Sequence, residues 1–224
     1  MTIKAIFLDF YGTVVQEDEE SLIKICHKIK EHSITESSAI EIGHYWMGKF
    51  THLINSCQGE KFSPQREISA NSLKDTLLHF NSTANEDELL EIMFTPWKNP
   101  AIFTDAIEFF EKNTLPIYIL SNVDQSDISE AINLLHLKVD GVITSEDVRA
   151  YKPHSEMFEY ALKLSGLSPE EVLHVGDSLT GDVLGANQVG IQSCWLNRSQ
   201  KSIQEESKPT FVIENLNEIF ALLN

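Results

Sequence analysis

The sequence predicts an α/β fold, a doubly wound parallel sheet with an inserted α-helical cap. Short apolar runs alternate with helical patterns along most of the chain, which is typical of a parallel sheet with crossover helices. The stretch 16–98 differs, because it contains helical patterns and no convincing strand. Polar or Gly-rich residues follow the main apolar runs, at the edge where such sheets bind their ligands. These three observations together predict the fold class.

Six apolar runs are predicted to be the strands of this sheet. The first run ends at Asp9 and breaks at Gly12, where a residue without a side chain allows a tight turn. The later runs are each short enough for a buried strand and lie between helical patterns. The predicted strands are Ile3–Leu8, Ile117–Leu120, Gly141–Ile143, Val172–Val175, Gln192–Leu196 and Phe211–Ile213.

Four helices are predicted between the first two strands. Leu22, Ile25 and Ile29 repeat at helical spacing, and a similar pattern begins at Ile42. The acidic run 17–20 is favoured at a helix start by the helix dipole. These helices predict two domains, a core of residues 1–15 and 99–224 and a cap of residues 16–98.

The third and fourth cap helices have predicted starts. Pro64 is expected at the first helical position, where its missing N–H is not needed. Asn85 followed by Glu88 resembles a capping box. Pro96 and Trp97 are expected in the linker that returns from the cap to the core.

The chain has 34 acidic and 17 basic residues and a formal charge of −17. This balance argues against nucleic acid or an anionic membrane surface as a partner, since both require a basic footprint. No apolar run approaches the roughly 20 residues that span a bilayer, and the first residues do not resemble a signal peptide. We therefore expect a cytoplasmic protein that acts on a small molecule. Nothing in the sequence indicates its oligomeric state.

Four patches at the ends of predicted strands carry residues that could perform chemistry. Since the carboxyl ends of parallel strands share one edge of a sheet, the patches are expected to converge. They are Asp9–Thr13, Ser121–Asn122, Lys152–Pro153 and Gly176–Asp182.

The residue types in these patches suggest a covalent mechanism at a charged centre. The Asp9 carboxylate could attack phosphorus or carbon. Asp9 and Asp177, together with a backbone carbonyl, would form an oxygen-rich site suited to Mg²⁺. Ser121 could donate hydrogen bonds to phosphoryl oxygens, and Lys152 could supply fixed positive charge.

The four patches, in this order, resemble the motifs of the haloacid dehalogenase superfamily of hydrolases. The stretch 174–187 is similar to the fourth motif of its phosphatase branch. The resemblance implies a Rossmann-like core, a mobile cap, a small anionic phosphorylated substrate and Mg²⁺. It also implies roles for individual residues: Asp9 as nucleophile; Asp9, the Tyr11 carbonyl and Asp177 as Mg²⁺ ligands; Asp182 supporting the metal or holding Lys152; and Thr13, Ser121 and Asn122 orienting the nucleophile and the phosphoryl group.

Tyr11 departs from the phosphatase pattern. That branch has an Asp two residues after the nucleophile, where it protonates the leaving group and then activates water. An unperturbed Tyr has a pKa of about 10 and is a poor base near neutrality. Losing a positioned acid–base group typically lowers the rate by about 10²- to 10⁴-fold. The resemblance therefore predicts a phosphohydrolase that is slow, takes its acid from elsewhere or prefers good leaving groups.

Three alternatives follow from this departure. A 2-haloacid dehalogenase carries Tyr in that slot and needs no metal, but it uses a cap arginine. Here the only arginines are Arg66, Arg149 and Arg198, none of them on the early cap helices. A phosphonoacetaldehyde hydrolase would need a cap lysine, for which Lys28 or Lys49 could be proposed. The third alternative binds a phosphorylated ligand without turnover. The Mg²⁺-dependent phosphohydrolase ranks first, because Asp177 and Asp182 beside Asp9 would repel one another without a cation.

Overall fold

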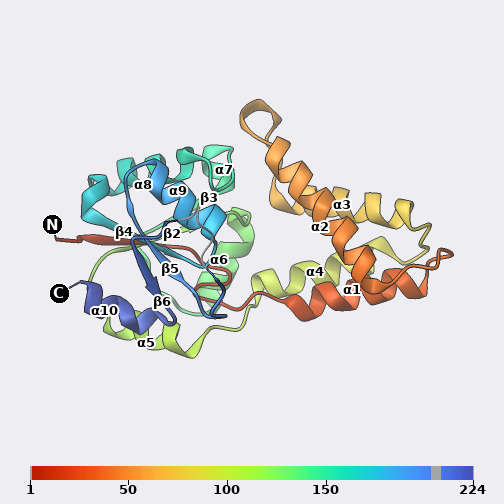
Figure 1. Cartoon of the computed structure of the whole chain (residues 1–224), viewed down its shortest axis with the longest axis horizontal. Helices are drawn as coiled ribbons and strands as arrows, with labels where there is room; N and C mark the ends of the chain where they lie inside the picture. The colour runs from red at the N-terminus through yellow and green to blue at the C-terminus, as the bar shows by residue number, and fades with distance from the viewer. Residues whose placement is uncertain (1, 203–207, 224) are drawn as a thin grey trace.

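The computed structural model describes residues 2–202 and 208–223, which contain one six-stranded sheet (Figure 1). Its strand order is β3-β2-β1-β4-β5-β6, and all neighbouring strands are parallel. This confirms the predicted α/β class. The order reverses between β1 and β4, so that the strand ends at this point form the crevice typical of ligand sites. The strands are β1 (Ala5–Leu8), β2 (Ile117–Ser121), β3 (Gly141–Thr144), β4 (Val172–Gly176), β5 (Gln192–Leu196) and β6 (Phe211–Ile213).

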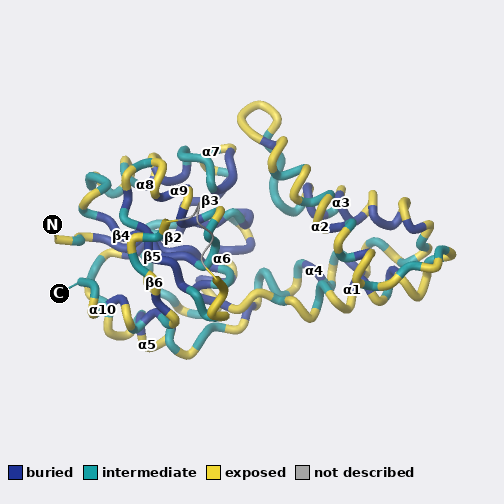
Figure 2. The backbone as a smooth tube through the Cα atoms, viewed as in Figure 1, coloured by how far each residue is buried: buried dark blue, intermediate teal, exposed yellow. Residues whose placement is uncertain are grey.

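Helices cover both faces of the sheet. Side chains alternate between the faces along each strand, so Ile6 and Leu8 join one apolar cluster and Phe7 joins the other. The cluster around Ile6 and Leu8 includes α5 (Thr104–Lys112), α6 (Gln125–Leu134) and α10 (Ile219–Leu222). The cluster around Phe7 includes α8 (Ser155–Ser165) and α9 (Leu184–Gln188). Figure 2 shows the strands buried between these layers.

Shorter helical segments connect these layers. The short helix α7 spans Ser145–Val148. A π-helical turn spans Leu179–Val183, and 3₁₀ turns span Gly59–Lys61, Pro169–Glu171 and Leu216–Glu218. No helix in the described part of the chain is long and apolar enough to cross a bilayer.

Four helices form a second lobe beside the sheet, which we call the helical lobe (Figure 1). They are α1 (Glu19–Glu31), α2 (Ala39–Ser56), α3 (Gln65–His79) and α4 (Glu86–Lys98). The lobe has its own apolar cluster around Trp46, whose indole N–H donates to Ser72 Oγ at 3.0 Å. The Asn85 side chain accepts from the backbone N–H of Glu88, as expected for a helix cap. The division into domains 1–15 with 99–224 and 16–98 stays a prediction.

Two expectations about the helical lobe were wrong. Pro96 and Trp97 lie in the last turn of α4 and not in a linker. Pro64 lies one position before the first residue of α3, where its side chain offers no acceptor for the free N–H groups of that helix. The missing acceptor comes from the sheet lobe, because the Asp124 carboxylate accepts from Gln65 N at 2.6 Å and from Arg66 N at 2.9 Å. The start of α3 is thus fixed by a contact between the lobes.

Candidate active site

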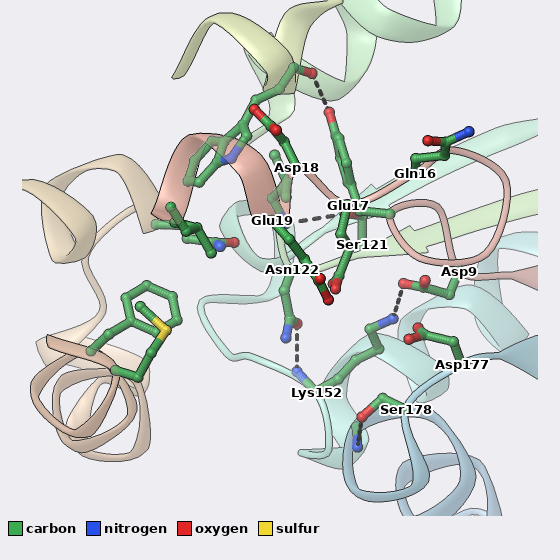
Figure 3. Close-up of a pocket in the computed structure, with 18 of the residues that line it drawn as sticks. Asp9, Gln16, Glu17, Asp18, Glu19, Ser121, Asn122, Lys152, Asp177 and Ser178 are labelled. Atoms are coloured by element: carbon green, nitrogen blue, oxygen red, sulfur yellow. Dashed lines mark hydrogen bonds and ion pairs between the residues drawn. The ribbon is translucent and has the colours of Figure 1, made fainter. Parts of the chain in front are cut away.

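The predicted patches meet at the point where the strand order reverses. Asp9 follows β1, and its N–H donates to the Val175 carbonyl of the neighbouring strand β4 at 2.9 Å. Ser121 ends β2 on the other side of β1, and Asp177 directly follows β4. Because β2, β1 and β4 are adjacent and parallel, their ends place these side chains at one edge. Figure 3 shows them around a single pocket with Lys152.

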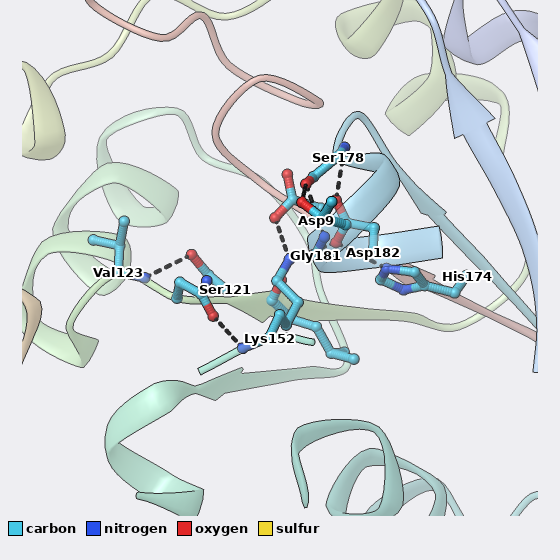
Figure 4. Close-up of polar contacts among 11 residues, drawn as sticks. Asp9, Ser121, Val123, Lys152, His174, Ser178, Gly181 and Asp182 are labelled. Atoms are coloured by element: carbon cyan, nitrogen blue, oxygen red, sulfur yellow. Dashed lines mark hydrogen bonds and ion pairs between the residues drawn. The ribbon is translucent and has the colours of Figure 1, made fainter. Parts of the chain in front are cut away.

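Lys152 lies at the centre of the polar network (Figure 4). Its side chain is 4% exposed, and Nζ donates to Asp9 Oδ1 and Asp182 Oδ1, both at 2.6 Å, and to the Leu120 carbonyl at 3.0 Å. Burial alone would lower the pKa of Lys152, but the carboxylates of Asp182 and Asp9 raise it. The backbone of the same residue is fixed by Asn122, whose Oδ1 accepts from Lys152 N at 2.8 Å. Lys152 is therefore a permanently charged, immobilised cation against Asp9.

Both carboxylate oxygens of Asp182 contact neighbouring residues. Oδ1 contacts Lys152 and lies 3.0 Å from His174 Nε2, while Oδ2 accepts from Ser178 N at 3.1 Å. Burial would raise the pKa of this carboxyl, yet Lys152 and the hydrogen bond with His174 hold it below the usual range. Of the two roles implied for Asp182, the contacts correspond to holding Lys152.

Asp9, Asp177 and Asp182 offer carboxylate oxygens that lie within 4.8 Å of one another. Asp9 Oδ2 is buried and has no hydrogen-bond partner among the described residues. Burial and the charges of Asp9 and Asp182 raise the pKa of Asp177 to about 8, and burial likewise raises the pKa of Asp9. The cluster therefore has more negative charge than Lys152 balances. An unpartnered carboxylate oxygen and hard oxygen donors fit a divalent cation such as Mg²⁺.

Gly12 allows the loop after β1 to approach this cluster. Its φ is +87°, a conformation that favours glycine, and its N–H donates to the Val15 carbonyl at 2.8 Å. A Cβ on Gly12 would lie 2.8 Å from carboxylate atoms of Asp177. The absence of a side chain at Gly12 is therefore needed for Asp177 to reach the site.

The Tyr11 hydroxyl is engaged away from the carboxylate cluster of Asp9, Asp177 and Asp182. The phenol donates a hydrogen bond to the carbonyl oxygen of Trp97, in the last turn of α4. Burial raises the pKa of Tyr11, so the phenol stays protonated. Tyr11, at the position where the phosphatase pattern has an Asp, instead links the loop after β1 to the helical lobe. The implied role of the Tyr11 carbonyl as a metal ligand stays a prediction.

Thr13 and Ser121 are both buried beside this loop. The Thr13 hydroxyl has no hydrogen bond of normal geometry among the described residues, but it lies near enough to Asp9 to lower the pKa of that carboxyl. Ser121 Oγ accepts from Val123 N at 3.2 Å. Their predicted orienting roles stay predictions.

A cavity of about 650 Å³ lies between the two lobes. Seven of the eight predicted site residues line it, all except Thr13, namely Asp9, Tyr11, Ser121, Asn122, Lys152, Asp177 and Asp182. The helical lobe contributes Trp46, Met47, Phe50, Met93 and Trp97. Among the described residues that line the cavity there is no arginine and no histidine, and the lysines are Lys152 and Lys201.

Some residues of this site carried no clear signal in the sequence. His174 was noted only as a neighbour of the fourth motif, yet it is fully buried against Asp182. Trp195, whose indole N–H donates to the Asp177 carbonyl at 2.8 Å, lies on β5 with no motif around it. Glu17 lines the cavity from a segment that the sequence suggested only as a solvated helix start. The places of these three residues in the site depend on contacts between segments far apart in the sequence, so local patterns do not predict them.

Comparisons with known proteins place the chain in a family. A family model for haloacid dehalogenase-like hydrolases matches residues 3–190. The chain is 26% identical to an (S)-2-haloacid dehalogenase of Pseudomonas putida, over 97% of this chain and 95% of that protein. It is 23% identical to the pyrophosphatase PpaX of Bacillus cereus, over 100% of this chain and 98% of that protein. Its fold resembles that of the putative HAD-hydrolase YfnB of Bacillus subtilis, solved with bound magnesium, with a TM-score of 0.75 and 20% identity over the full length of both chains.

Proposed function

Because the chain belongs to the haloacid dehalogenase-like hydrolases, we propose that it is a Mg²⁺-dependent phosphohydrolase of small phosphorylated metabolites. The observation that carries the proposal is the excess negative charge around Asp9. Its Oδ2 has no partner among the described residues, and the pKa of Asp177 is raised to about 8. If the reaction used no metal, the charges of Asp9 and Asp177 would repel one another without a cation to offset them. The magnesium-bound relative and the full-length pyrophosphatase relative support the same reading.

In the proposed reaction, Asp9 attacks phosphorus and forms an aspartyl-phosphate, which water then hydrolyses. Lys152 Nζ donates a hydrogen bond to Asp9 Oδ1 and so places a positive charge beside the nucleophile. Asn122 accepts a hydrogen bond from the backbone N–H of Lys152 and so helps to keep the Lys152 ammonium group in place during the reaction. Asp9 and Asp177 would hold the Mg²⁺, which when bound supplies positive charge against the phosphoryl oxygens and the attacking carboxylate.

The second candidate is a 2-haloacid dehalogenase, in which Asp9 attacks carbon and displaces halide. Tyr11 in the slot of the second acid and the full-length Pseudomonas relative favour it. The cavity argues against it, because no arginine lines it in the described part of the chain. Arg66, although on the helical lobe, is held by both oxygens of Asp127. A phosphonoacetaldehyde hydrolase has less support, since neither Lys28 nor Lys49 lines the cavity.

Two parallel assays test the proposal. We expect p-nitrophenyl phosphate to be hydrolysed with Mg²⁺, with activity lost in EDTA and in Asp9→Asn. We expect no halide release from 2-chloropropionate. Metal-independent halide release would favour the dehalogenase. Phosphate-dependent binding without turnover of any phosphate ester would favour the non-catalytic alternative.

A further inference from the structure

The proposed phosphohydrolase needs a proton for its leaving group, and Tyr11 does not supply it. Its hydroxyl is engaged by the Trp97 carbonyl. Without an acid, the departing oxygen leaves as an alkoxide, which slows cleavage most for basic leaving groups. The following inference rests on the proposed function and concerns the residue that takes the place of the missing acid.

Glu17 is held at the mouth of the cavity between two fixed points. On one side, Gln16 N donates to the Ala101 carbonyl at 2.8 Å, which ties the segment to the chain returning from the helical lobe. On the other side, Asp18 caps α1, with Oδ1 accepting from Ser21 N at 3.1 Å. Glu17 is the single residue between these anchors, and it lines the cavity (Figure 3). Its backbone is thus positioned although its side chain is exposed.

The other acidic groups that line the cavity already have roles or partners. Asp9 is the proposed nucleophile, and Asp177 belongs to the proposed cation site. Asp182 is held by Lys152 and His174, while Asp18 caps a helix. Since no histidine lines the described cavity, Glu17 and Glu19 remain as carboxyl groups able to exchange a proton.

Charge distinguishes Glu17 from Glu19. The carboxylate of Glu17 has no hydrogen bond or ion pair among the described residues, yet its charge raises the pKa of Asp177. Partial desolvation in the cleft raises the pKa of Glu17, the charges of Asp9 and Glu19 raise it further, and Lys201 opposes them. Glu19 lies in the first turn of α1 and also lines the cavity. Glu17 therefore lines the same cavity as Asp9 and Asp177, near enough for their charges to interact, and Glu19 serves as its matched control.

The geometry points to Glu17 as the catalytic acid and base of this phosphohydrolase. In the first half-reaction, a bond forms between an Asp9 oxygen and phosphorus, the bond from phosphorus to the leaving oxygen breaks, and the Glu17 carboxyl gives that oxygen its proton. In the second half-reaction, the Glu17 carboxylate takes a proton from water as the water oxygen attacks phosphorus. Phosphate then leaves with both bonding electrons kept by Asp9, and Glu17 is again protonated.

The dependence of kcat/KM on leaving-group basicity tests this role. This parameter reports the steps up to phosphorylation of Asp9, in which Glu17 acts as the acid. Wild type, Glu17→Gln and Glu19→Gln are compared on p-nitrophenyl, phenyl and methyl phosphate with Mg²⁺. For Glu17→Gln we expect kcat/KM to fall by about 10²-fold or more on methyl phosphate and by less than about tenfold on p-nitrophenyl phosphate. Glu19→Gln is expected to keep the wild-type slope.

The outcomes separate this inference from the proposed function. Active wild-type protein with the same slope in Glu17→Gln overturns the role of Glu17 and leaves the proposed function intact. The same change of slope in Glu19→Gln also overturns it, because the effect would then belong to the charge of the whole segment. A wild-type protein that hydrolyses no phosphate ester overturns both. Circular dichroism is used to check that both variants fold, and we expect wild-type spectra because both glutamates are exposed.

Discussion

The ion pair between Arg66 on α3 and Asp127 on α6 joins the two lobes through a buried carboxylate. Arg66 Nε donates to Asp127 Oδ2 and Nη2 donates to Oδ1, both at 2.6 Å. The Asp127 side chain is 0% exposed, whereas the Arg66 side chain is 32% exposed. If the pair is broken, water can therefore hydrogen-bond to the partly exposed Arg66 guanidinium but not to the buried Asp127 carboxylate. Arg66→Met removes the partner that the buried carboxylate depends on.

The free energy of unfolding should fall by about 3 to 5 kcal/mol in Arg66→Met, because the variant leaves a buried charge uncompensated. Asp127→Asn should lower it by only about 1 to 2 kcal/mol, since water reaches the partly exposed guanidinium and one acceptor remains. The Lys98–Glu130 pair joins α4 to the same core helix at 2.8 Å, with side chains 42% and 56% exposed. Lys98→Met should therefore change stability by less than about 1 kcal/mol.

Urea unfolding of wild type, the three single variants and Arg66→Met/Asp127→Asn measures these differences. The double variant should be more stable than Arg66→Met, because it no longer buries an unpaired charge. If Arg66→Met loses no more stability than Lys98→Met, the buried pair does not fasten the lobes as we argue. A double variant less stable than both single variants would also refute the reasoning.

Two further predictions concern the proposed cation site. Gly12→Ala should lower stability by about 1 to 3 kcal/mol and weaken Mg²⁺ binding, because Gly12 has a φ of +87° and its Cβ would lie 2.8 Å from Asp177. The control Gly48→Ala in α2, where a Cβ would have no atom within 4 Å, should instead raise stability by about 0.5 to 1 kcal/mol. Unfolding temperatures that shift in the same direction for both variants would contradict this prediction. Since the pKa of Asp177 is raised to about 8, Mg²⁺ must displace its proton below that pH. Calorimetric titrations should show Mg²⁺ affinity falling by about tenfold per pH unit below pH 8 and levelling above it, and an affinity independent of pH from 6 to 9 would contradict the assignment.

The sheet could be predicted from the sequence because its signals are local. Each buried strand is a short apolar run, and a parallel sheet requires the ends of those runs to share an edge. Asp9, Ser121, Lys152 and Asp177 therefore converge in the structure as expected, although the predicted first strand began two residues before Ala5. Their individual roles stay predictions that the proposed assays address.

The contacts that orient the site could not be predicted in the same way. The Tyr11 hydroxyl finds the Trp97 carbonyl across the interface between the lobes, and α3 takes its N-terminal acceptor from Asp124. Each contact joins residues that are remote in sequence, and neither leaves a pattern in composition or spacing. The sequence alone identified the acid missing at Tyr11, but Glu17 became a candidate only through the residues that line the cavity and the charges near them.

Acid-quench mass spectrometry of the protein during turnover tests the central claim most directly. The protein is mixed with Mg²⁺ and p-nitrophenyl phosphate, quenched in acid and digested, and the peptide that contains Asp9 is examined. We predict that this peptide carries one acid-stable, hydroxylamine-sensitive phosphoryl group on Asp9, which disappears when Mg²⁺ is chelated. Turnover with an unmodified Asp9 peptide, or an ester of Asp9 formed from 2-chloropropionate without metal, would contradict the account.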